Sequence, residues 1–262
     1  LMIFYAIGEK LDLHHIPALS NVLYSEDILF PIADFYLKKE RWNEAIEVYE
    51  EMETIGALQE RGAEYYQKLG YALQKSKKYA EAIGAYLKAD TLKPDNIWNN
   101  RHLAICYRLN RNYQAALSYY KKVEEATPED TNVIFHIGSC LAELGQYEEA
   151  ANYFFKLDFI ESNCIKAWRG IGWCSFISRK YEQAMKYYEK IIEQKPLAID
   201  YMNAGHVAWT MGDIQKAAAL YGKSITANGN RERFLEMFRK DEEALLKQGI
   251  QEEDIPLMLD LL

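Results

Sequence analysis

The residues of this chain best suited to chemistry are four cysteines, five histidines and one Gly-Lys-Ser segment. Three of the cysteines, Cys106, Cys140 and Cys174, recur every 34 residues. If that period reflects stacked helices, equivalent positions lie one helix spacing apart, about 8–10 Å. This distance is too long for a disulfide or for shared metal ligands. We therefore expect these three thiols to be small packing residues, whereas Cys164 lies in a predicted turn where it could be exposed.

The other chemical motifs are incomplete. Gly222-Lys223-Ser224 resembles the end of a phosphate-binding loop, but that motif needs Gly five residues before Gly222, where the sequence has Ala217. His14 and His15 are adjacent, so they point to different sides of a helix and are poor co-ligands. No Ser/His/Asp set, carboxylate pair or metalloprotease motif stands out. The sequence therefore predicts a protein that is not an enzyme and has no catalytic residues, no cofactor and no metal.

Composition narrows the class of protein further. The chain has 262 residues, 49% of them apolar and 27% charged, with 6 Pro and 14 Gly. These values exclude a disordered or collagen-like chain, and four cysteines are too few for a disulfide scaffold. No apolar run approaches the roughly 20 residues of a transmembrane helix, so we expect no membrane insertion. The net charge of −8 argues against a general nucleic-acid binder.

The chain begins at Leu1 rather than Met, which indicates a processed, trimmed or excised segment. Residues 1–7 are apolar but follow no basic region, so they do not resemble a signal peptide, although a cleaved signal would leave no trace. We therefore favour a cytoplasmic location, and the sequence leaves the oligomeric state open.

A period of about 34 residues organises most of the chain. Its marker is an Ala followed four residues later by an aromatic residue and preceded twelve residues earlier by another small residue. The markers are Ala82, Ala116, Ala150, Ala184 and Ala217, and an earlier Ala45 makes six copies over about residues 26–229.

Each copy predicts two helices. In the first, apolar or small residues recur on one helical face, and the second runs from the Ala through its aromatic residue. Stacking such pairs places the Gly and Ala positions where backbones approach closely. We expect Gly172 to accept Ala, because Ala33 and Ala104 occupy the same position in other copies.

Helix ends are marked by proline and aspartate. Pro94, Pro128 and Pro196 stand just past predicted second helices, where a helix must already have ended. Asp95 and Asp130 follow, near the next helix starts, which they could cap.

This pattern resembles the tetratricopeptide repeat, a 34-residue helix pair with the pattern W-x2-L-G-x2-Y…A-x3-F…P. One copy follows it nearly throughout, with Tyr66, Leu69, Gly70, Leu73, Tyr79, Ala82, Tyr86, Ala89 and Pro94. The resemblance covers about four-fifths of the chain. It implies an all-α, right-handed α-solenoid of about six helix-turn-helix repeats with C-terminal capping helices.

The register divides the chain into three regions. Residues 1–25 fit no repeat and form an irregular N-terminal segment, residues 26–229 hold the six repeats, and residues 230–262 form C-terminal capping helices. Residues 231–248 predict one amphipathic helix with Phe234, Phe238 and Leu245 on one face. Such a helix would cover the apolar side of the last repeat.

A second stripe on each first helix lies outside the core pattern, and the resemblance implies that it lines the concave side. In copies three to six it holds four Lys or Arg, no acidic residue and three of the five Trp. Exposed Trp and Arg are enriched at binding hot spots, and Arg pairs bidentately with carboxylates. The alternative is that the aromatic residues only fill the inside of a tight superhelix. The predicted peptide-binding groove consists of Trp98, Arg101, Arg108, Phe135, His136, Lys166, Arg169, Trp173, His206 and Trp209.

The same stripe is acidic in the first two copies, with Asp27, Asp34 and Glu64 and no basic residue. These residues should repel an acidic peptide and fix its direction or its end. Some members of the family hold a peptide's terminal carboxylate with Lys, Arg and Asn on successive repeats. The corresponding residues here are Arg101, Ile105, His136, Lys166 and Gly170, so the two Asn and one basic residue are absent.

The sequence thus predicts a non-enzymatic scaffold that binds a protein or peptide segment, acidic or carboxylate-terminated, in its groove. It predicts no nucleic-acid partner. One alternative is a regulatory or linker domain cut from a larger protein, for which the start at Leu1 is the clue. Another is a self-assembling structural module that uses the apolar tail at residues 255–262.

Overall fold

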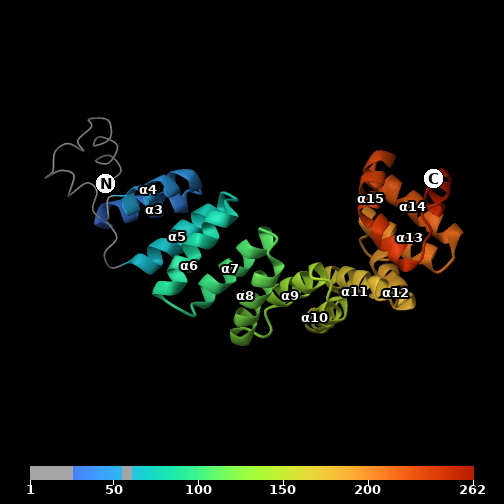
Figure 1. Cartoon of the computed structure of the whole chain (residues 1–262), viewed down its shortest axis with the longest axis horizontal. Helices are drawn as coiled ribbons and strands as arrows, with labels where there is room; N and C mark the ends of the chain where they lie inside the picture. Colours follow the sequence, from blue (N-terminus) through green and yellow to red (C-terminus); the bar gives the residue numbers. More distant parts are fainter. Residues whose placement is uncertain (1–25, 55–60) are drawn as a thin grey trace. The chain divides into compact units, whose positions relative to one another are not determined.

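The computed structural model describes residues 26–54 and 61–262, so the predicted irregular segment at residues 1–25 lies outside the described residues. Within that part of the chain the structure is all-α, without strands (Figure 1), and no helix there is long and apolar enough to cross a membrane. The helices are α3 (Glu26–Lys38), α4 (Trp42–Thr54), α5 (Gly62–Lys75), α6 (Tyr79–Leu92), α7 (Ile97–Leu109), α8 (Tyr113–Ala126), α9 (Thr131–Glu143), α10 (Tyr147–Ile160), α11 (Ile165–Ile177), α12 (Tyr181–Ile192), α13 (Ala198–Thr210), α14 (Ile214–Asn228), α15 (Arg231–Gln248) and α16 (Asp254–Asp260).

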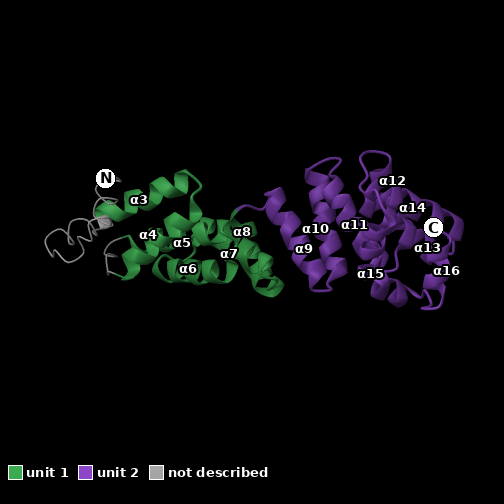
Figure 2. Cartoon of the chain, turned by 90° about the horizontal axis from the view of Figure 1, so that it is seen from above, with its two compact units in different colours: residues 1–126 green, residues 127–262 purple. Residues whose placement is uncertain are grey.

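Helices α3 to α14 form helix–turn–helix pairs, each packed along its own partner from α3 with α4 to α13 with α14. The chain divides into two compact units, residues 1–126 and 127–262 (Figure 2). In the first unit α4 packs on α5 and α6 on α7, and in the second α10 packs on α11 and α12 on α13. First helices of neighbouring pairs also touch, α5 with α7 and α9 with α11, so each unit has a face built from first helices.

The core of each pair is an aromatic ring laid against a small residue. The rings at the repeat position are all buried and comprise Tyr49, Tyr86, Tyr120, Phe154, Tyr188 and Tyr221. A Cβ atom on Gly172 would lie 2.9 Å from Cζ of Tyr188, closer than real contacts allow. The expectation that Gly172 accepts Ala stays a prediction, and the structure adds that the buried Tyr188 ring must shift to admit the methyl group.

The turn after every first helix contains one residue in the left-handed backbone region. At Lys77 the φ angle is 62°, and the amide of Lys78 returns to the carbonyl of Leu73 at 2.9 Å. This geometry ends the helix and satisfies its last carbonyl groups. The equivalent residues of the other pairs are Glu40, Arg111, Gly145, Arg179 and Gly212.

Of the two predicted aspartate caps, the structure confirms one. Asp130 caps α9, and its Oδ1 accepts hydrogen bonds from the amides of Asn132 and Val133 at 3.0 and 3.1 Å. Asp95 has a φ of 56° and is not a cap. The cap of α7 is instead Asn96, whose Oδ1 accepts from the amide of Asn99 at 2.9 Å.

Helix α15 covers the last repeat with the face that the sequence predicts. Phe234, Phe238 and Leu245 are buried, and α15 packs on both α13 and α14. Its last residue, Gln248, reaches back to the preceding pair, where it accepts from the Tyr181 hydroxyl at 2.9 Å and donates to the Ile177 carbonyl at 3.2 Å. The helix therefore joins the last two repeats.

The apolar tail at residues 255–262 divides between core and surface. Within α16, Ile255 and Met258 are buried, whereas Leu257 is 64% exposed and Leu261, just after the helix, is 63% exposed.

Candidate functional site

All four cysteines are buried free thiols. Burial raises the pKa of Cys106 and of Cys174 to about 12, so both are protonated and unreactive near neutral pH. Cys164 occupies the N-cap position of α11 without a capping side-chain hydrogen bond and is also buried, so the structure does not expose it as the sequence suggested it could. Among the described residues no group of three potential ligands could hold a metal ion.

The predicted groove residues divide between the two compact units. Trp98, Arg101 and Arg108 lie on α7 of the first unit, and the other seven belong to the second. Each unit has its own cavity on the face built from first helices.

The second unit has a cavity of about 430 Å³ bounded by α9, α11 and α13. We call it the Trp173 groove and define it by Phe135, Phe154, Lys166, Arg169, Gly170 and Trp173. Four of these are predicted groove residues, so the structure brings Phe135, Lys166, Arg169 and Trp173 together. His136 neighbours Phe135, with ring centroids 5.4 Å apart, but does not line this cavity.

The floor of the Trp173 groove is an aromatic ring that the sequence analysis assigned only to the core. Phe154 of α10 lies between Gly138 and Gly170, and a Cβ atom on Gly170 would be 2.5 Å from its Cδ2. This contact explains why the groove lacks a basic side chain at Gly170, since any side chain there would strike Phe154. The signal in the sequence was the pair of glycines on successive first helices.

The two cations of this groove differ in availability. Arg169 forms a bidentate pair with Asp200, with Nε and Nη2 each 2.7 Å from a carboxylate oxygen, and Asp200 is only 1% exposed. Arg169 therefore binds α13 rather than standing open to a ligand, contrary to its predicted role. Lys166 is half-exposed, with Nζ 3.3 Å from Glu161 and 5.7 Å above the Phe135 ring. Lys166 is thus also paired, but its partner Glu161 is exposed whereas Asp200 is buried, so a ligand carboxylate can compete for Lys166 more readily than for Arg169.

His206 and Trp209 do not line an open groove, because α15 covers them. His206 is fully buried, with Nδ1 2.8 Å from the Tyr221 hydroxyl and Nε2 3.4 Å from a carboxylate oxygen of Asp241 on α15. Trp209 is also buried and stacks on Phe238 of the same helix. The sequence predicted that α15 covers the last repeat but not that it covers this stripe.

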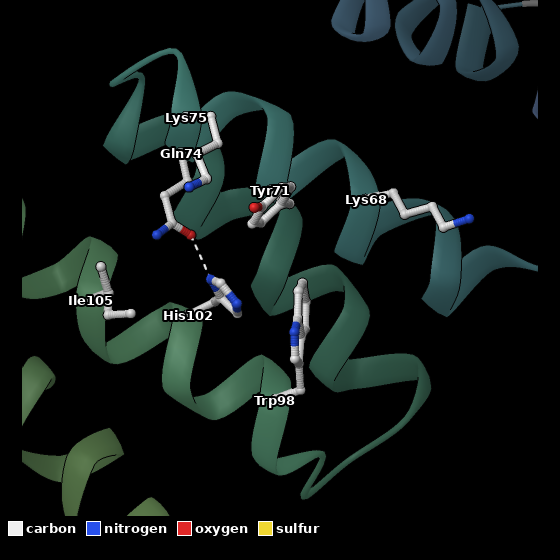
Figure 3. A pocket seen from close by; sticks show the side chains of 7 residues that line it. All are labelled: Lys68, Tyr71, Gln74, Lys75, Trp98, His102 and Ile105. Carbon is white, nitrogen blue, oxygen red and sulfur yellow. Dashed lines mark hydrogen bonds between the residues drawn. The ribbon is translucent and has the colours of Figure 1, made fainter. Parts of the chain in front are cut away.

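The first unit has a cavity of about 470 Å³ between α5 and α7 (Figure 3). We call it the Trp98 pocket; it is lined by Lys68, Tyr71, Gln74, Lys75, Trp98, His102 and Ile105. Trp98 is 43% exposed, as the prediction requires, and its ring lies 4.0 Å from that of His102. Arg101 and Arg108 are half-buried and do not line it; Nε of Arg108 lies 3.4 Å from the Tyr120 hydroxyl.

A hydrogen-bonded set fixes the floor of the Trp98 pocket. Oε1 of Gln74 lies 3.0 Å from the Tyr86 hydroxyl and 2.7 Å from Nδ1 of His102. Burial, with Lys75 and Arg101 nearby, lowers the pKa of His102 to about 4. His102 is therefore a neutral imidazole near pH 7.

The predicted acidic stripe of the first two repeats is partly neutralised. Lys68 lies 2.7 Å from both carboxylate oxygens of Asp34 and 2.9 Å from Glu64. Lys68 directly follows the stripe residue Gln67 in sequence, so a count restricted to stripe residues did not include it. The Asp34–Lys68 pair thus links α3 to α5, whereas the Glu64–Lys68 pair lies within α5, and neither carboxylate presents free negative charge.

Comparison with known proteins agrees with this architecture. Sequence profiles described as tetratricopeptide repeat match residues 29–61, 63–96, 108–174, 165–196 and 201–231. No curated protein matches the chain by sequence.

Several solved structures have a similar fold. A tetratricopeptide repeat protein from Parabacteroides merdae aligns over 90% of this chain and 97% of its own, with 19% identity and a TM-score of 0.62. YrrB, described as a repeat protein of this kind with an unusual peptide-binding site, aligns over 68% of this chain and 92% of its own at 21% identity and a TM-score of 0.57. MamA from Desulfovibrio magneticus RS-1 aligns over 65% and 97%, with 18% identity and a TM-score of 0.58.

Proposed function

Because the chain belongs to the tetratricopeptide repeat family, we propose that it is a non-enzymatic scaffold that binds a peptide segment of a partner protein in the Trp173 groove. Stacked helical repeats commonly use the surface formed by successive first helices for binding. The description of YrrB, a protein of similar fold, as having a peptide-binding site supports this assignment.

The observation that carries the proposal is the combination of an aromatic floor with one cation, Lys166, whose carboxylate partner, Glu161, is itself exposed. Phe135, Phe154 and Trp173 offer apolar surface to a buried side chain, and Lys166 stands at the same cavity. Apolar burial supplies binding energy, and Lys166 favours an acidic neighbour in the ligand.

Whether the ligand offers an acidic side chain or a terminal carboxylate follows from the basic residues that remain available in the groove. Arg169 is bound to Asp200, and Gly170 stands where some family members have a basic residue, so a clamp for a terminal carboxylate is incomplete. We therefore favour an internal segment with an acidic side chain beside a large apolar one over a terminal carboxylate.

The experiment is a selection of random dodecapeptides displayed on phage, followed by calorimetric affinities for the enriched sequences. Trp173→Ala and Lys166→Glu should each weaken binding at least about tenfold, the effect of losing a hot-spot contact. Lys186→Glu is the matched control, because Lys186 is an exposed lysine on the second helix α12 and lies outside the groove.

If all three variants bind the enriched peptides as tightly as the wild-type chain does, the Trp173 groove is excluded as the binding site. The alternative of a regulatory or linker domain is compatible with the same groove. The alternative of self-assembly relies on Leu257 and Leu261 and is tested separately by the mass of the protein in solution.

A further inference from the structure

We propose that the Trp98 pocket is a second binding site, which takes an aromatic side chain carrying a hydrogen-bond donor, Tyr or Trp, next to an acidic residue in a peptide. The inference deepens the proposed function and rests on it only in taking the ligand to be a peptide. All residues of the pocket lie on α5 and α7 of the first unit, and none belongs to the Trp173 groove.

The walls of the pocket suit an aromatic ring. Trp98 presents 43% of its surface although it is the largest side chain at the cavity, and the Tyr71 ring lies 6.2 Å from it. Figure 3 shows Tyr71 from α5 and Trp98 from α7 facing the same space, with His102 beside them. A flat ring entering this space can pack against both walls.

The floor of the pocket presents an unused hydrogen-bond acceptor. Oε1 of Gln74 is a carbonyl oxygen that can only accept, so Nδ1 of His102, 2.7 Å away, must carry the proton. A neutral imidazole has a single N–H, which leaves Nε2 with a lone pair. Within residues 26–54 and 61–262, Nε2 has no hydrogen-bond partner. A ligand that donates a hydrogen bond to Nε2 would complete the set.

The charge at the mouth of the pocket selects the neighbour of the aromatic residue. Nζ of Lys75 lies 5.2 Å above the Tyr71 ring and forms no ion pair in the part of the chain that the structure describes, whereas Lys68 is held by Asp34 and Glu64. An acidic ligand residue would pair with Lys75. A ligand arginine also stacks and donates, but Lys75 and Arg101 would repel it.

The first test determines the tautomer of His102 in the intact chain. Long-range ¹H–¹⁵N correlation of the imidazole rings should show a protonated nitrogen at Nδ1 and an unprotonated nitrogen at Nε2. A proton on Nε2 at pH 7 would overturn the inference, because the pocket would then offer a donor rather than an acceptor.

The second test compares the peptides Ac-Glu-Tyr-Glu-NH2 and Ac-Glu-Phe-Glu-NH2, which differ only in the donor hydroxyl. Titration is followed by the indole N–H signal of Trp98, assigned with Trp98→Phe. The Tyr peptide should bind about fivefold more tightly, the effect of one neutral hydrogen bond. His102→Phe keeps a ring in place and should remove this preference, and Lys75→Gln should weaken both peptides.

Trp173→Ala separates this inference from the proposed function and should leave the shift at Trp98 unchanged. A shift at Trp173 without one at Trp98 would support the proposed function and overturn the inference. Equal affinity of the Tyr and Phe peptides in the wild-type chain would also overturn it.

Discussion

The small residue that faces each aromatic ring sets how closely the two helices of a pair approach. Gly172 lies against Tyr188, whereas Gly84 on α6 has no atom within 4 Å of a Cβ built on it. Gly84→Ala should raise the free energy of unfolding by about 0.5–1 kcal/mol, since Ala is the better helix former. The change in the free energy of unfolding for Gly172→Ala should be about 1 kcal/mol less favourable than for Gly84→Ala, because the Tyr188 ring must move.

Gly172→Leu should lower the free energy of unfolding by about 1–3 kcal/mol through overpacking. Urea denaturation of the three variants measures these differences. Equal stabilisation by Ala at Gly84 and at Gly172 would contradict the close contact with Tyr188.

The neutral state of His102 makes stability depend on pH. Its pKa is about 4 in the folded chain, below the ordinary value of 6.5, so the unfolded chain binds the proton more readily. Stability from this group is therefore fully present above pH 6.5 and is lost as pH falls towards 4. The loss between pH 7 and pH 4.5 should be about 2 kcal/mol.

The measurement compares the slope of unfolding free energy against pH in the wild type and in His102→Phe, which removes the titrating group. The variant should lose about 2 kcal/mol less than the wild type over this range. Identical slopes would show that His102 is not a buried neutral imidazole.

At the scale of elements, the turn between paired helices carries a strain that glycine would relieve. Lys77 and Arg111 have φ angles of 62° and 61°, a region that costs most side chains about 1 kcal/mol or more. Lys77→Gly and Arg111→Gly should each raise the free energy of unfolding by about 0.5–1 kcal/mol. Gly145→Ala, at the equivalent turn with φ 76°, should lower it by a similar amount. Thermal or urea denaturation measures these changes. A shift of the same sign for the two Gly variants and for Gly145→Ala would contradict the prediction.

Helix positions and buried faces could be predicted because the same pattern of apolar and small residues recurs in every copy of the repeat. Helix α15 illustrates the accuracy, since its bounds and its buried Phe234, Phe238 and Leu245 match the prediction. Helix caps were harder to predict, because a shift of one residue in where the helix begins changes which side chain is the cap. Asn96 rather than Asp95 caps α7 for this reason.

The candidate site was less predictable because its state depends on contacts between residues far apart in sequence. Arg169 is bound by Asp200, 31 residues later, and His206 is covered by Asp241 and Phe238 of α15. A stripe counted along single helices contains no information on these partners. The aromatic floor at Phe154 was missed because a core residue and a groove residue look alike in sequence.

At the scale of the whole molecule, α15 should control the stability of the last two repeats. Phe238 touches His206, Trp209 and Tyr221, so Phe238→Ala should lower the free energy of unfolding by about 3–5 kcal/mol. Leu246→Ala on the exposed side of the same helix should change it by less than about 0.5 kcal/mol.

Removal of residues 231–262 should expose the aromatic stripe of α13 and cause association or precipitation on heating. Light scattering during a thermal ramp would show this. A truncated chain that stays monomeric and unfolds at the wild-type temperature would contradict the covering role of α15.

The central claim, that the face built from first helices binds peptide, can be tested most directly with the tryptophan indole signals in a ¹H–¹⁵N spectrum. Trp173 and Trp168 lie on the same helix, but Trp173 lines the groove while Trp168 is buried with its Nε1 bonded to Asp158 at 2.7 Å. Addition of a selected peptide should shift the Trp173 signal and leave Trp168 in place. A shift at Trp168 with Trp173 unchanged would place binding on another face and contradict the account.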